Sequence, residues 1–469
     1  MGWTREEILA ATGGEILRLG RQSVFGDVVT DSQRAVRRSV FVALQGQRVD
    51  GHAFLDDALR RGAGCLVVHK KLGNRKLNRV NPTVIKVEDT LKALGDLAHY
   101  RRQRVAPKVM AITGSNGKTT TKEMVASICR FAAIQGLPLR GRVLKTEGNY
   151  NNLVGLPLTL LRLASRDRVA VVELGTSEPG EIRRLTEIAD PDFGIITSVA
   201  PAHLTGLNTL RGVAREKGAL FRDMGPRGVA VVNLDDPWTR RLGKSFKGGK
   251  ITYGTKGEVR GEKLKALGEK GTEFTLRAGG GRRRVRLRLP GVHNVSNALG
   301  AAAMAYGLGA TLEAMRRGLE AVKPIPMRMA VEKVRGIGVI NDAYNANPAS
   351  MEAALKALAA IACKGNRVAV LGDMLELGRQ ASKRHYELGQ AVARSGLDHL
   401  YLLGQFAPEV RRGALDQGMD GDRVTIGKNH SSVATLLHRQ AKRGDWFLFK
   451  GSRGIGMEKV LATFRVMGG

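Results

Sequence analysis

Residues 109–124 read VMAITGSNGKTTTKEM. The β-branched run from Val109 to Thr113 predicts a buried strand, and the residues from Lys118 onwards predict the start of a helix. The small residues between them form a turn whose backbone N–H groups can surround phosphate oxygens, and the helix N-terminus adds partial positive charge. In this order Lys118 can reach the β- and γ-phosphates of a nucleotide, and the Thr119 hydroxyl can bind Mg²⁺. The stretch therefore predicts a phosphate-binding loop between a strand and a helix.

The loop has the spacing GxxGKT, which is shorter than the commonest phosphate-loop pattern because Ile112 stands where that pattern has its first glycine. The order of strand, loop and helix still holds, and the lysine and threonine directly after the glycine add specificity. An ordinary glycine turn before a helix is the alternative. The residues expected to contact a nucleotide are Gly114, Ser115, Asn116, Gly117, Lys118, Thr119 and Thr120.

Length and composition bound the class of protein. A chain of 469 residues predicts about three domains on a prior of ~150 residues each. The three cysteines lack metal-ligand spacing, which argues against a disulfide framework and favours a reducing compartment. No apolar run approaches the ~18 residues that a membrane span needs, and the N-terminus does not read as a signal peptide. We therefore expect a cytoplasmic protein without membrane association.

The formal net charge of +33 would by itself suggest a nucleic-acid partner. The basic residues are spread along the chain, however, and aromatic residues make up only 5% of it, so no basic stretch is interleaved with aromatics. We expect no specific nucleic-acid partner and a solvated basic surface that can steer an anionic substrate. A basic nucleic-acid-dependent ATPase remains the alternative from another class.

The order of predicted elements divides the chain into three α/β domains. Residues 1–106 form a small α/β domain. Residues 107–323 alternate strands and helices, which predicts a central, doubly wound and mainly parallel sheet that carries the phosphate loop. Residues 324–469 alternate again as a third α/β domain. Composition predicts linkers at 105–108 and 323–326, where prolines interrupt the pattern.

Polar residues follow two further predicted strands of the central domain. Glu173 ends the apolar run from Val169, and His203 follows the run from Phe193. Ligands gather beyond the carboxyl ends of parallel strands, so both side chains should project towards the same edge as Lys118. Glu173 offers a hard oxygen ligand for Mg²⁺. A lone Glu or His is more often structural, but a place beside a phosphate loop favours a role in chemistry.

Two later segments are ambiguous by themselves. Lys217 lies in a helical stretch over 210–222, where a solvated lysine is the plain interpretation. Asn294 and Asn297 belong to an Asn/His cluster that opens an alanine-rich helix. Their amides could hydrogen-bond an adenine or ribose, or could simply cap the helix.

Taken together, TGSNGKTT, the strand ends at Glu173 and His203, Lys217 in AREKGALF, and HNVSNA resemble the Mur ligase superfamily. Its members are ATP-dependent, amide-forming ligases of peptidoglycan precursor synthesis. Within it, NDAYNANPASM at 341–351 resembles the signature of the ligases that add the dipeptide D-alanyl-D-alanine. The stretches TEGNYNNLVGLPLTLL, VVELGTSEPGEI, VLGDMLELG and KGSR agree, so the resemblance covers essentially the whole chain.

The resemblance implies a function in cell-wall biogenesis, and hence in cell shape and cell division. ATP would phosphorylate the terminal carboxylate of UDP-MurNAc-tripeptide, and the amine of D-Ala-D-Ala would attack the acyl phosphate. The implied cofactors are ATP and Mg²⁺, with Thr119 and Glu173 holding one ion and His203 and a carbamoylated Lys217 the other. Lys118, His203 and Lys217 would be the catalytic residues, the third domain would be Rossmann-like, and we expect a monomer.

The resemblance also implies binding roles for residues of all three domains. Asn294, Asn297 and Arg328 would bind ATP. The residues that would bind the other substrates are Asp31 and Ser32 for the uridine nucleotide, Asn149, Asn151 and Asn152 in the cleft, and Asp342, Tyr344, Asn345 and Asn347 for the dipeptide. Gln33 stands where the family has an arginine, and Arg48 could compensate. A sibling ligase that adds an amino acid, a folylpolyglutamate-type ligase, and a plain Asn-rich helix start at Asn347 are the alternatives.

Overall fold

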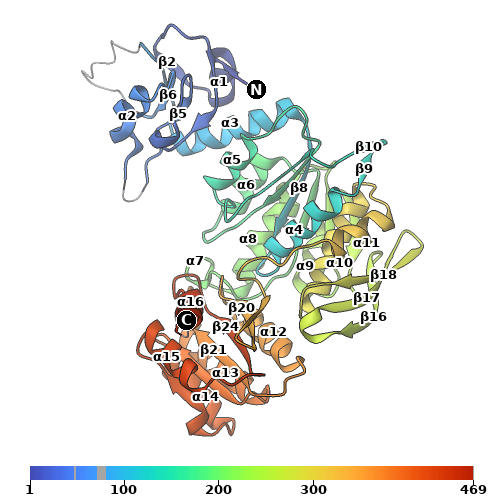
Figure 1. The fold of residues 1–469 in the computed structure, drawn as a ribbon. Helices are drawn as coiled ribbons and strands as arrows, with labels where there is room; N and C mark the ends of the chain where they lie inside the picture. Colours follow the sequence, from blue (N-terminus) through green and yellow to red (C-terminus); the bar gives the residue numbers. More distant parts are fainter. Residues whose placement is uncertain (47–48, 71–80, 468–469) are drawn as a thin grey trace.

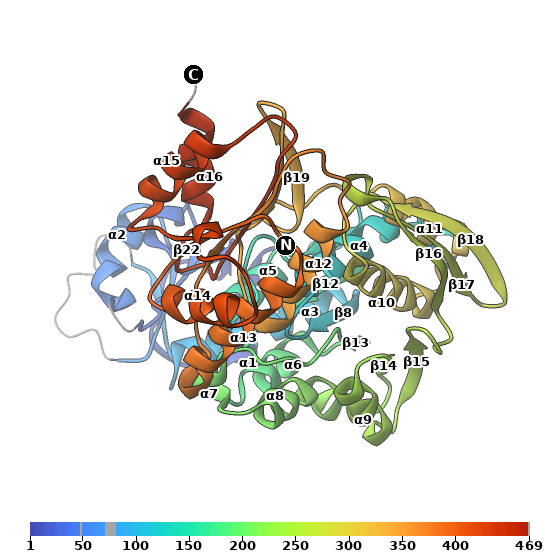
Figure 2. The same cartoon turned by 90° about the horizontal axis from the view of Figure 1, so that it is seen from below.

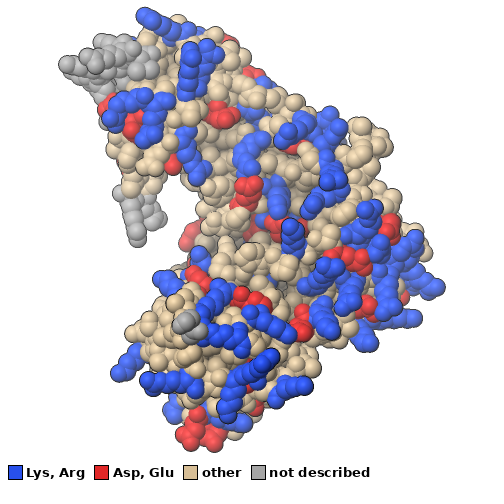
Figure 3. Space-filling view, viewed as in Figure 1, with Lys and Arg blue, Asp and Glu red and all other residues tan. Residues whose placement is uncertain are grey.

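A computed structural model describes residues 1–46, 49–70 and 81–467. Three sheet-centred units follow one another along the molecule from the N-terminus to the C-terminus (Figure 1). Seen from below, the third unit lies in front of the other two (Figure 2). Lysine and arginine side chains are spread over the visible face rather than confined to one stripe (Figure 3).

The first unit is built on a five-stranded sheet in the order β2-β7-β6-β5-β4, in which β2 is antiparallel to β7 and the other pairs are parallel. Its elements pack into two apolar clusters, one on each face of the sheet. A short antiparallel pair, β1 and β3, forms a separate two-stranded sheet. The bounds are β1 Trp3–Thr4, α1 Arg5–Thr12, β2 Glu15–Arg18, β3 Val24–Phe25, β4 Val28–Val29, β5 Val40–Val42, α2 Leu55–Arg60, β6 Cys65–Val68, β7 Thr83–Lys86 and α3 Thr90–Val105.

The second unit is built on a six-stranded, fully parallel sheet in the order β11-β12-β8-β13-β14-β15. Helices α4 and α10 cover one face, and α5, α6 and α8 cover the other, so the sheet is doubly wound. The bounds are β8 Lys108–Thr113, α4 Lys118–Cys129, β9 Ala133–Ile134, β10 Leu137–Pro138, β11 Val143–Lys145, α5 Gly155–Leu160, β12 Val169–Glu173, α6 Glu181–Ala189, β13 Phe193–Ile196, α7 Leu204–Leu207, α8 Leu210–Asp223, β14 Val229–Asn233, α9 Pro237–Ser245, β15 Gly249–Tyr253 and α10 His293–Gly307.

A three-stranded antiparallel sheet extends the second unit beyond α10 (Figure 1). Its inner face, with Phe274, Leu276 and Val285, packs into the same apolar cluster as α4 and α10. The alternating buried and exposed residues of β18 confirm the half-exposed strand that the sequence predicts near Val285. The bounds are β16 Arg260–Ala266, β17 Thr272–Ala278, β18 Gly281–Leu287 and α11 Leu312–Glu320.

The third unit is built on a six-stranded sheet in the order β19-β20-β24-β21-β22-β23, parallel except for the edge strand β19. Helices α12, α13 and α14 cover one face, and α15 and α16 the other. The bounds are β19 Ala330–Val334, β20 Ile337–Asp342, α12 Pro348–Ala359, β21 Arg367–Gly372, α13 Ala381–Arg394, β22 His399–Leu403, α14 Ala407–Asp416, β23 Val424–Ile426, α15 His430–Gln440, β24 Trp446–Lys450 and α16 Glu458–Val466.

These sheets confirm the predicted α/β class, and the turn between the first two units lies within the predicted first linker. Helix α3 continues to Val105 and β8 already begins at Lys108, so only Ala106 and Pro107 separate them. Ala106 has a left-handed φ of 51° and ends the helix, and its N–H donates to the carbonyl of Arg102. Pro107 cannot continue a helix, so a two-residue turn is sufficient.

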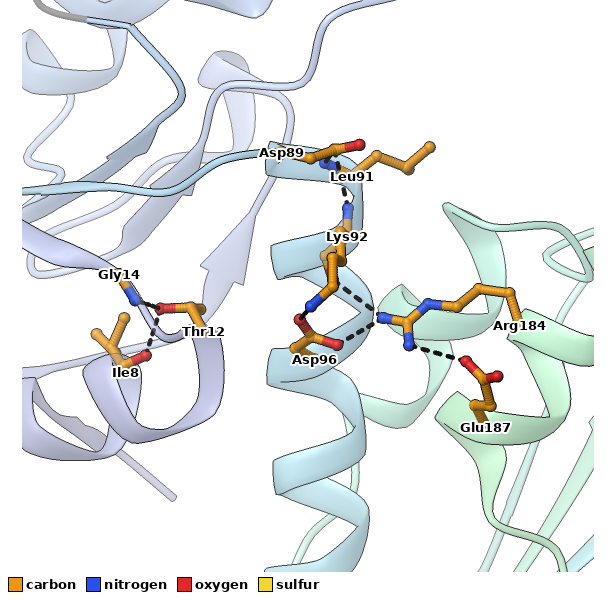
Figure 4. Close-up of polar contacts among 9 residues, drawn as sticks. All are labelled: Ile8, Thr12, Gly14, Asp89, Leu91, Lys92, Asp96, Arg184 and Glu187. Atoms are coloured by element: carbon orange, nitrogen blue, oxygen red, sulfur yellow. Dashed lines mark hydrogen bonds and ion pairs between the residues drawn. The ribbon is translucent and has the colours of Figure 1, made fainter.

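Polar contacts tie the first unit to the second along α3 and α6. Arg184 of α6 donates to Asp96 of α3 at 2.5 Å, and Asp96 also accepts from Lys92 at 2.8 Å (Figure 4). Arg184 also contacts Glu187 of its own helix at 3.4 Å.

The described part of the chain contains no helix that is long and apolar enough to cross a membrane.

Candidate active site

A cavity of about 670 Å³ lies between the second and third units. The phosphate loop, the carboxyl end of β12 and the start of α10 line one side of it, and the segment after β20 lines the other. Most of the residues singled out from the sequence meet here: Ser115, Asn116, Gly117, Lys118, Thr119, Thr120, Asn149, Asn151, Asn152, Glu173, His203, Asn294, Asn297, Arg328, Asp342, Tyr344, Asn345 and Asn347.

The phosphate loop begins where β8 ends at Thr113, and α4 starts at Lys118. Gly117 has a φ of 81°, and a Cβ on it would lie 2.2 Å from Oδ1 of Asn297. Only glycine therefore allows both this backbone conformation and the close approach of α10. Lys118 Nζ donates to the carbonyl oxygen of Gly114 at 2.8 Å, and burial lowers the pKa of this lysine although Glu173 opposes the shift.

Polar groups from the start of α4, the end of β12 and the segment between β11 and α5 converge beside the loop. The Thr119 hydroxyl donates to one carboxylate oxygen of Glu173 at 2.9 Å, and Asn151 donates to the other at 2.8 Å. Arg328 reaches across from the third unit and donates to the Thr119 hydroxyl at 3.3 Å. A hydroxyl, a carboxylate and an amide are thus gathered where a phosphate would meet the N-terminus of α4.

Lys217 is fully buried in α8, and this contradicts the interpretation as a solvated helix lysine. Its Nζ has no hydrogen-bond partner among the described residues. Burial, with a smaller contribution from Lys118, holds its pKa well below the ordinary value, so its amine is neutral more readily than an exposed one. The neighbouring Glu216 accepts from the N–H groups of Gly180 and Ile182 at 2.8 and 2.7 Å, which fixes α8 against α6.

His203 precedes α7 and pairs with a residue that the sequence reasoning did not select. Its Nδ1 lies 2.5 Å from a carboxylate oxygen of Glu376, on the loop after β21. The hydrogen bond from His203 lowers the pKa of the Glu376 carboxyl. The signal in the sequence was the stretch VLGDMLELG, which was noted for its resemblance but not resolved into residues.

Asn294 and Asn297 do not cap α10. The helix starts at His293, and Val292, which precedes it, makes no side-chain cap. Asn294 instead donates to the carbonyl of Pro290 at 2.8 Å, and Asn297 donates to Asn294 at 3.1 Å. The second amide is thereby held against Gly117 of the phosphate loop.

Asp342 is held by a buried lysine of the stretch KGSR, to which the sequence assigned a resemblance but no role. Lys450 at the end of β24 donates to one oxygen of Asp342 at 2.5 Å and to the carbonyl of Asn345 at 2.9 Å. The other oxygen of Asp342 accepts from the N–H of Met329 at 3.0 Å, directly after Arg328. The pair therefore joins the turn at Asn345 to the segment that carries Arg328.

Two further residues of the 341–351 segment support contacts with the second unit. The guanidinium carbon of Arg328 lies 3.9 Å from the ring centroid of Tyr344, a cation–π contact that holds the arginine in place. Asn347 donates to Asn116 of the phosphate loop at 2.8 Å, and its Oδ1 accepts from the N–H of Ser350 at 2.9 Å. Asn347 thus caps α12, as the plain interpretation holds, and also contacts the loop.

Some predicted residues lie elsewhere. Gly114 and Lys217 do not line the cavity, and both are buried. Asp31 and Ser32 belong to the first unit, where Asp31 accepts from the N–H of Gln33 at 2.9 Å. Arg48 lies outside the described residues.

Comparison with known proteins agrees with this geometry. Three family profiles match the chain in order: "Mur ligase family, catalytic domain" at residues 27–102, "Mur ligase middle domain" at 112–305 and "Mur ligase, glutamate ligase domain" at 327–453. The chain therefore belongs to the Mur ligase family, whose members are ATP-dependent ligases.

The particular similarities are to MurF. The chain is 34% identical to the UDP-N-acetylmuramoyl-tripeptide–D-alanyl-D-alanine ligase of Bacillus subtilis, with 94% of this chain and 93% of that one covered. It is similar to crystal structure I of MurF from Acinetobacter baumannii, with a TM-score of 0.90, 32% identity and 99% of each chain covered. MurF from Thermotoga maritima in complex with ADP has a TM-score of 0.82 and 28% identity, with 94% of this chain and 97% of that one covered. Within the family the chain groups with the MurF ligases rather than with the sibling ligases.

Substitution of Lys450 tests the buried pair with Asp342. Lys450→Met leaves a buried carboxylate without its cation, and we expect it to lower the free energy of unfolding by about 3–5 kcal/mol. The double variant Lys450→Met/Asp342→Asn should lose less than the sum of the two single variants. Chemical denaturation followed by tryptophan fluorescence measures both, with the exposed Lys364→Met as control. Equal effects of the two lysine substitutions would contradict the pair's role.

Proposed function

We propose that this chain joins D-alanyl-D-alanine to UDP-MurNAc-tripeptide at the expense of ATP, in the synthesis of peptidoglycan precursors. The carrying observation is the cavity in which Lys118, Thr119 and Glu173 of the second unit meet the segment 342–347 of the third. One side offers the groups that phosphoryl transfer needs, and the other offers polar groups for the incoming amine substrate.

The chemistry divides one difficult step into two. Oxide is a poor leaving group from a carboxylate, whereas phosphate is a good one, so the carboxylate oxygen first attacks the γ-phosphate and ADP leaves. The amine of the dipeptide then attacks the acyl carbon, and the tetrahedral intermediate expels phosphate. Lys118, Arg328 and the N-terminus of α4 supply positive charge where the phosphoryl group transfers.

The residues present fit two Mg²⁺ sites, which we propose as part of this function. Thr119 and Glu173 present oxygens 2.9 Å apart for the first. His203 and Lys217 would serve the second, and the buried amine of Lys217 without a hydrogen-bond partner fits modification there. When bound, Mg²⁺ neutralises the charge of the transferring phosphoryl group.

Lys217 suits carbamoylation because its pKa is lowered. A neutral amine attacks CO₂, forms an N–C bond and releases one proton, which leaves an anionic carbamate. An ammonium would repel a divalent cation, whereas a carbamate offers it oxygen ligands. Lys118 of the phosphate loop contributes to the lowered pKa of Lys217, which supports a place for the modified side chain near the site.

We propose that the three units correspond to domains at residues 1–106, 107–323 and 324–469. The first would hold the uridine nucleotide through Asp31 and Ser32, and Asn149, Asn151 and Asn152 would contact the substrate in the cleft. Asp342, Tyr344, Asn345 and Asn347 would position the dipeptide, and Asn294 and Asn297 the nucleotide. The proposal includes a monomeric enzyme without a specific nucleic-acid partner.

The test of this function is phosphate release from ATP with UDP-MurNAc-tripeptide, with and without D-Ala-D-Ala, together with mass analysis of the product. We expect release that depends on the dipeptide and yields UDP-MurNAc-pentapeptide. Activity with single amino acids instead would indicate a sibling specificity. Stimulation by polynucleotide alone would mean that the net charge, not the cavity, reports the function.

Lys118→Ala should reduce this turnover by at least about a hundredfold, because it removes a positive charge from the phosphoryl-transfer step. Lys108→Ala, an exposed lysine at the other end of β8, is the matched control and should keep wild-type turnover. Steady-state phosphate release measures both. Wild-type activity of Lys118→Ala would show that the phosphate loop is wrongly assigned.

Lys217→Ala should lose activity, and small carboxylates such as formate or acetate should restore part of it by supplying the missing oxygens. The cavity left by the truncated side chain gives such an anion room to bind. Lys118→Ala should show no such rescue, because it lacks an ammonium rather than a carboxylate. Turnover measured against carboxylate concentration distinguishes the two variants, and absence of rescue in Lys217→Ala would count against the carbamate.

A further inference from the structure

Glu376 of the third unit makes two contacts with the second unit. Its carboxylate lies 2.5 Å from Nδ1 of His203, and its carbonyl accepts from the N–H of Thr205 at 3.2 Å. Within the third unit, the N–H of the preceding Leu375 donates to Ser452 at 2.8 Å, which anchors the loop to the end of β24. The His203 turn is therefore held by a loop that the third unit itself fixes.

Both partners of this contact have unusual backbone conformations. His203 has a φ of 54° and Glu376 a φ of 62°, in the left-handed region that favours glycine. Such conformations persist where the surrounding structure determines them, and they cluster at functional sites. Because they occur on both sides of one hydrogen bond, we infer that the two backbone conformations bring His203 and Glu376 into contact.

The carboxylate also decides which nitrogen of His203 carries the proton. A carboxylate can only accept, so Nδ1 must be the donor, and in the neutral imidazole Nε2 is then left with a free lone pair. A carboxylate that holds one ring nitrogen in this way fixes both the tautomer and the orientation of a histidine that binds a metal through the other.

We infer that Glu376 is a positioning residue, which fixes His203 with Nε2 available to a divalent cation and does so only when the third unit is docked. This inference rests on the proposed metal role of His203. It makes completion of the second cation site depend on closure between the units, because the ligand belongs to one unit and the group that orients it to the other.

The first experiment needs no metal and no turnover. ¹⁵N NMR of the imidazole nitrogens reports the tautomer, and the His203 signals are assigned by their loss in His203→Asn. We expect wild-type His203 to be protonated at Nδ1. Glu376→Gln should give a mixture of tautomers, because an amide can donate as well as accept. Glu352→Gln, on the exposed face of α12 in the same unit, is the matched control and should leave the signals unchanged.

The second experiment uses Mn²⁺ as a paramagnetic probe, titrated by EPR in the presence of a non-hydrolysable ATP analogue. We expect Glu376→Gln to weaken the lower-affinity Mn²⁺ site about 10–100-fold, the usual effect of removing a group that orients a metal ligand. Glu376→Gly removes the left-handed strain together with the carboxylate. A purely structural role predicts that this variant is stable and binds Mn²⁺ normally, whereas a positioning role predicts the same weakening as in Glu376→Gln.

Three results would overturn the inference. An unchanged tautomer and unchanged Mn²⁺ binding in Glu376→Gln, with binding weakened in His203→Asn, would refute the role of Glu376 alone and leave the proposed function intact. An equal further loss from Glu376→Gln in the His203→Asn background would show that Glu376 does not act through His203. Unchanged Mn²⁺ binding in His203→Asn would overturn both this inference and the metal role on which it rests.

Discussion

The parallel register of three central strands determines where every reactive group of the second unit can lie. β8 pairs with β12 on one side and β13 on the other, so that Ile112 stands opposite both Glu173 and Ile195. These strands are buried on both faces, and a shift of one residue would turn each side chain to the opposite face of the sheet. The phosphate loop, the Glu173 carboxylate and the turn at His203 therefore emerge at one edge.

The site is nevertheless incomplete without the third unit. Arg328, Asn347 and Glu376 each reach a group of the second unit, at Thr119, Asn116 and His203 respectively. The buried Asp342–Lys450 pair holds the segment that carries the first two of these contacts. The sheet of the second unit thus presents the phosphate-binding groups, and the third unit adds the side chains that contact them. The relative placement of the two units therefore controls the geometry of the active site.

The α/β fold and the phosphate-binding side of the site could be predicted from local sequence. Strand, glycine turn and helix are neighbours in the chain, and so the phosphate loop could be predicted from residues 109–124 alone. Glu173 was predictable because parallel strands deliver their carboxyl ends to one edge. The edge strands β2 and β19 were not predicted, because short antiparallel edges lack a distinct apolar pattern.

The features that could not be predicted from the sequence are the burial and the contacts that tertiary structure determines. Lys217 has the sequence context of a solvated helix residue, and only the tertiary packing of α8 buries it. Lys450 and Glu376 lie more than a hundred residues along the chain from their contact partners, Asp342 and His203. Resemblance to a family indicated their segments, whereas the contacts that define their roles depend on how two units dock.

The electrostatics of the cavity explain why cationic side chains are held close together although their mutual repulsion is unfavourable. Lys118 lines the cavity and Lys217 is fully buried in α8, and each has a lowered pKa, with Lys118 adding to the shift at Lys217. Arg328 lies close enough to Lys118 to lower its pKa further. A protein that only needed to be stable would not bring the cationic side chains of Lys118 and Arg328 together beside the single carboxylate of Glu173, since burying charge without compensation is unfavourable. A polyphosphate supplies the missing negative charge, so the free energy that folding gives up at this site is recovered when the nucleotide binds. The repulsion between these cationic side chains therefore also makes the cavity selective for a ligand carrying several negative charges.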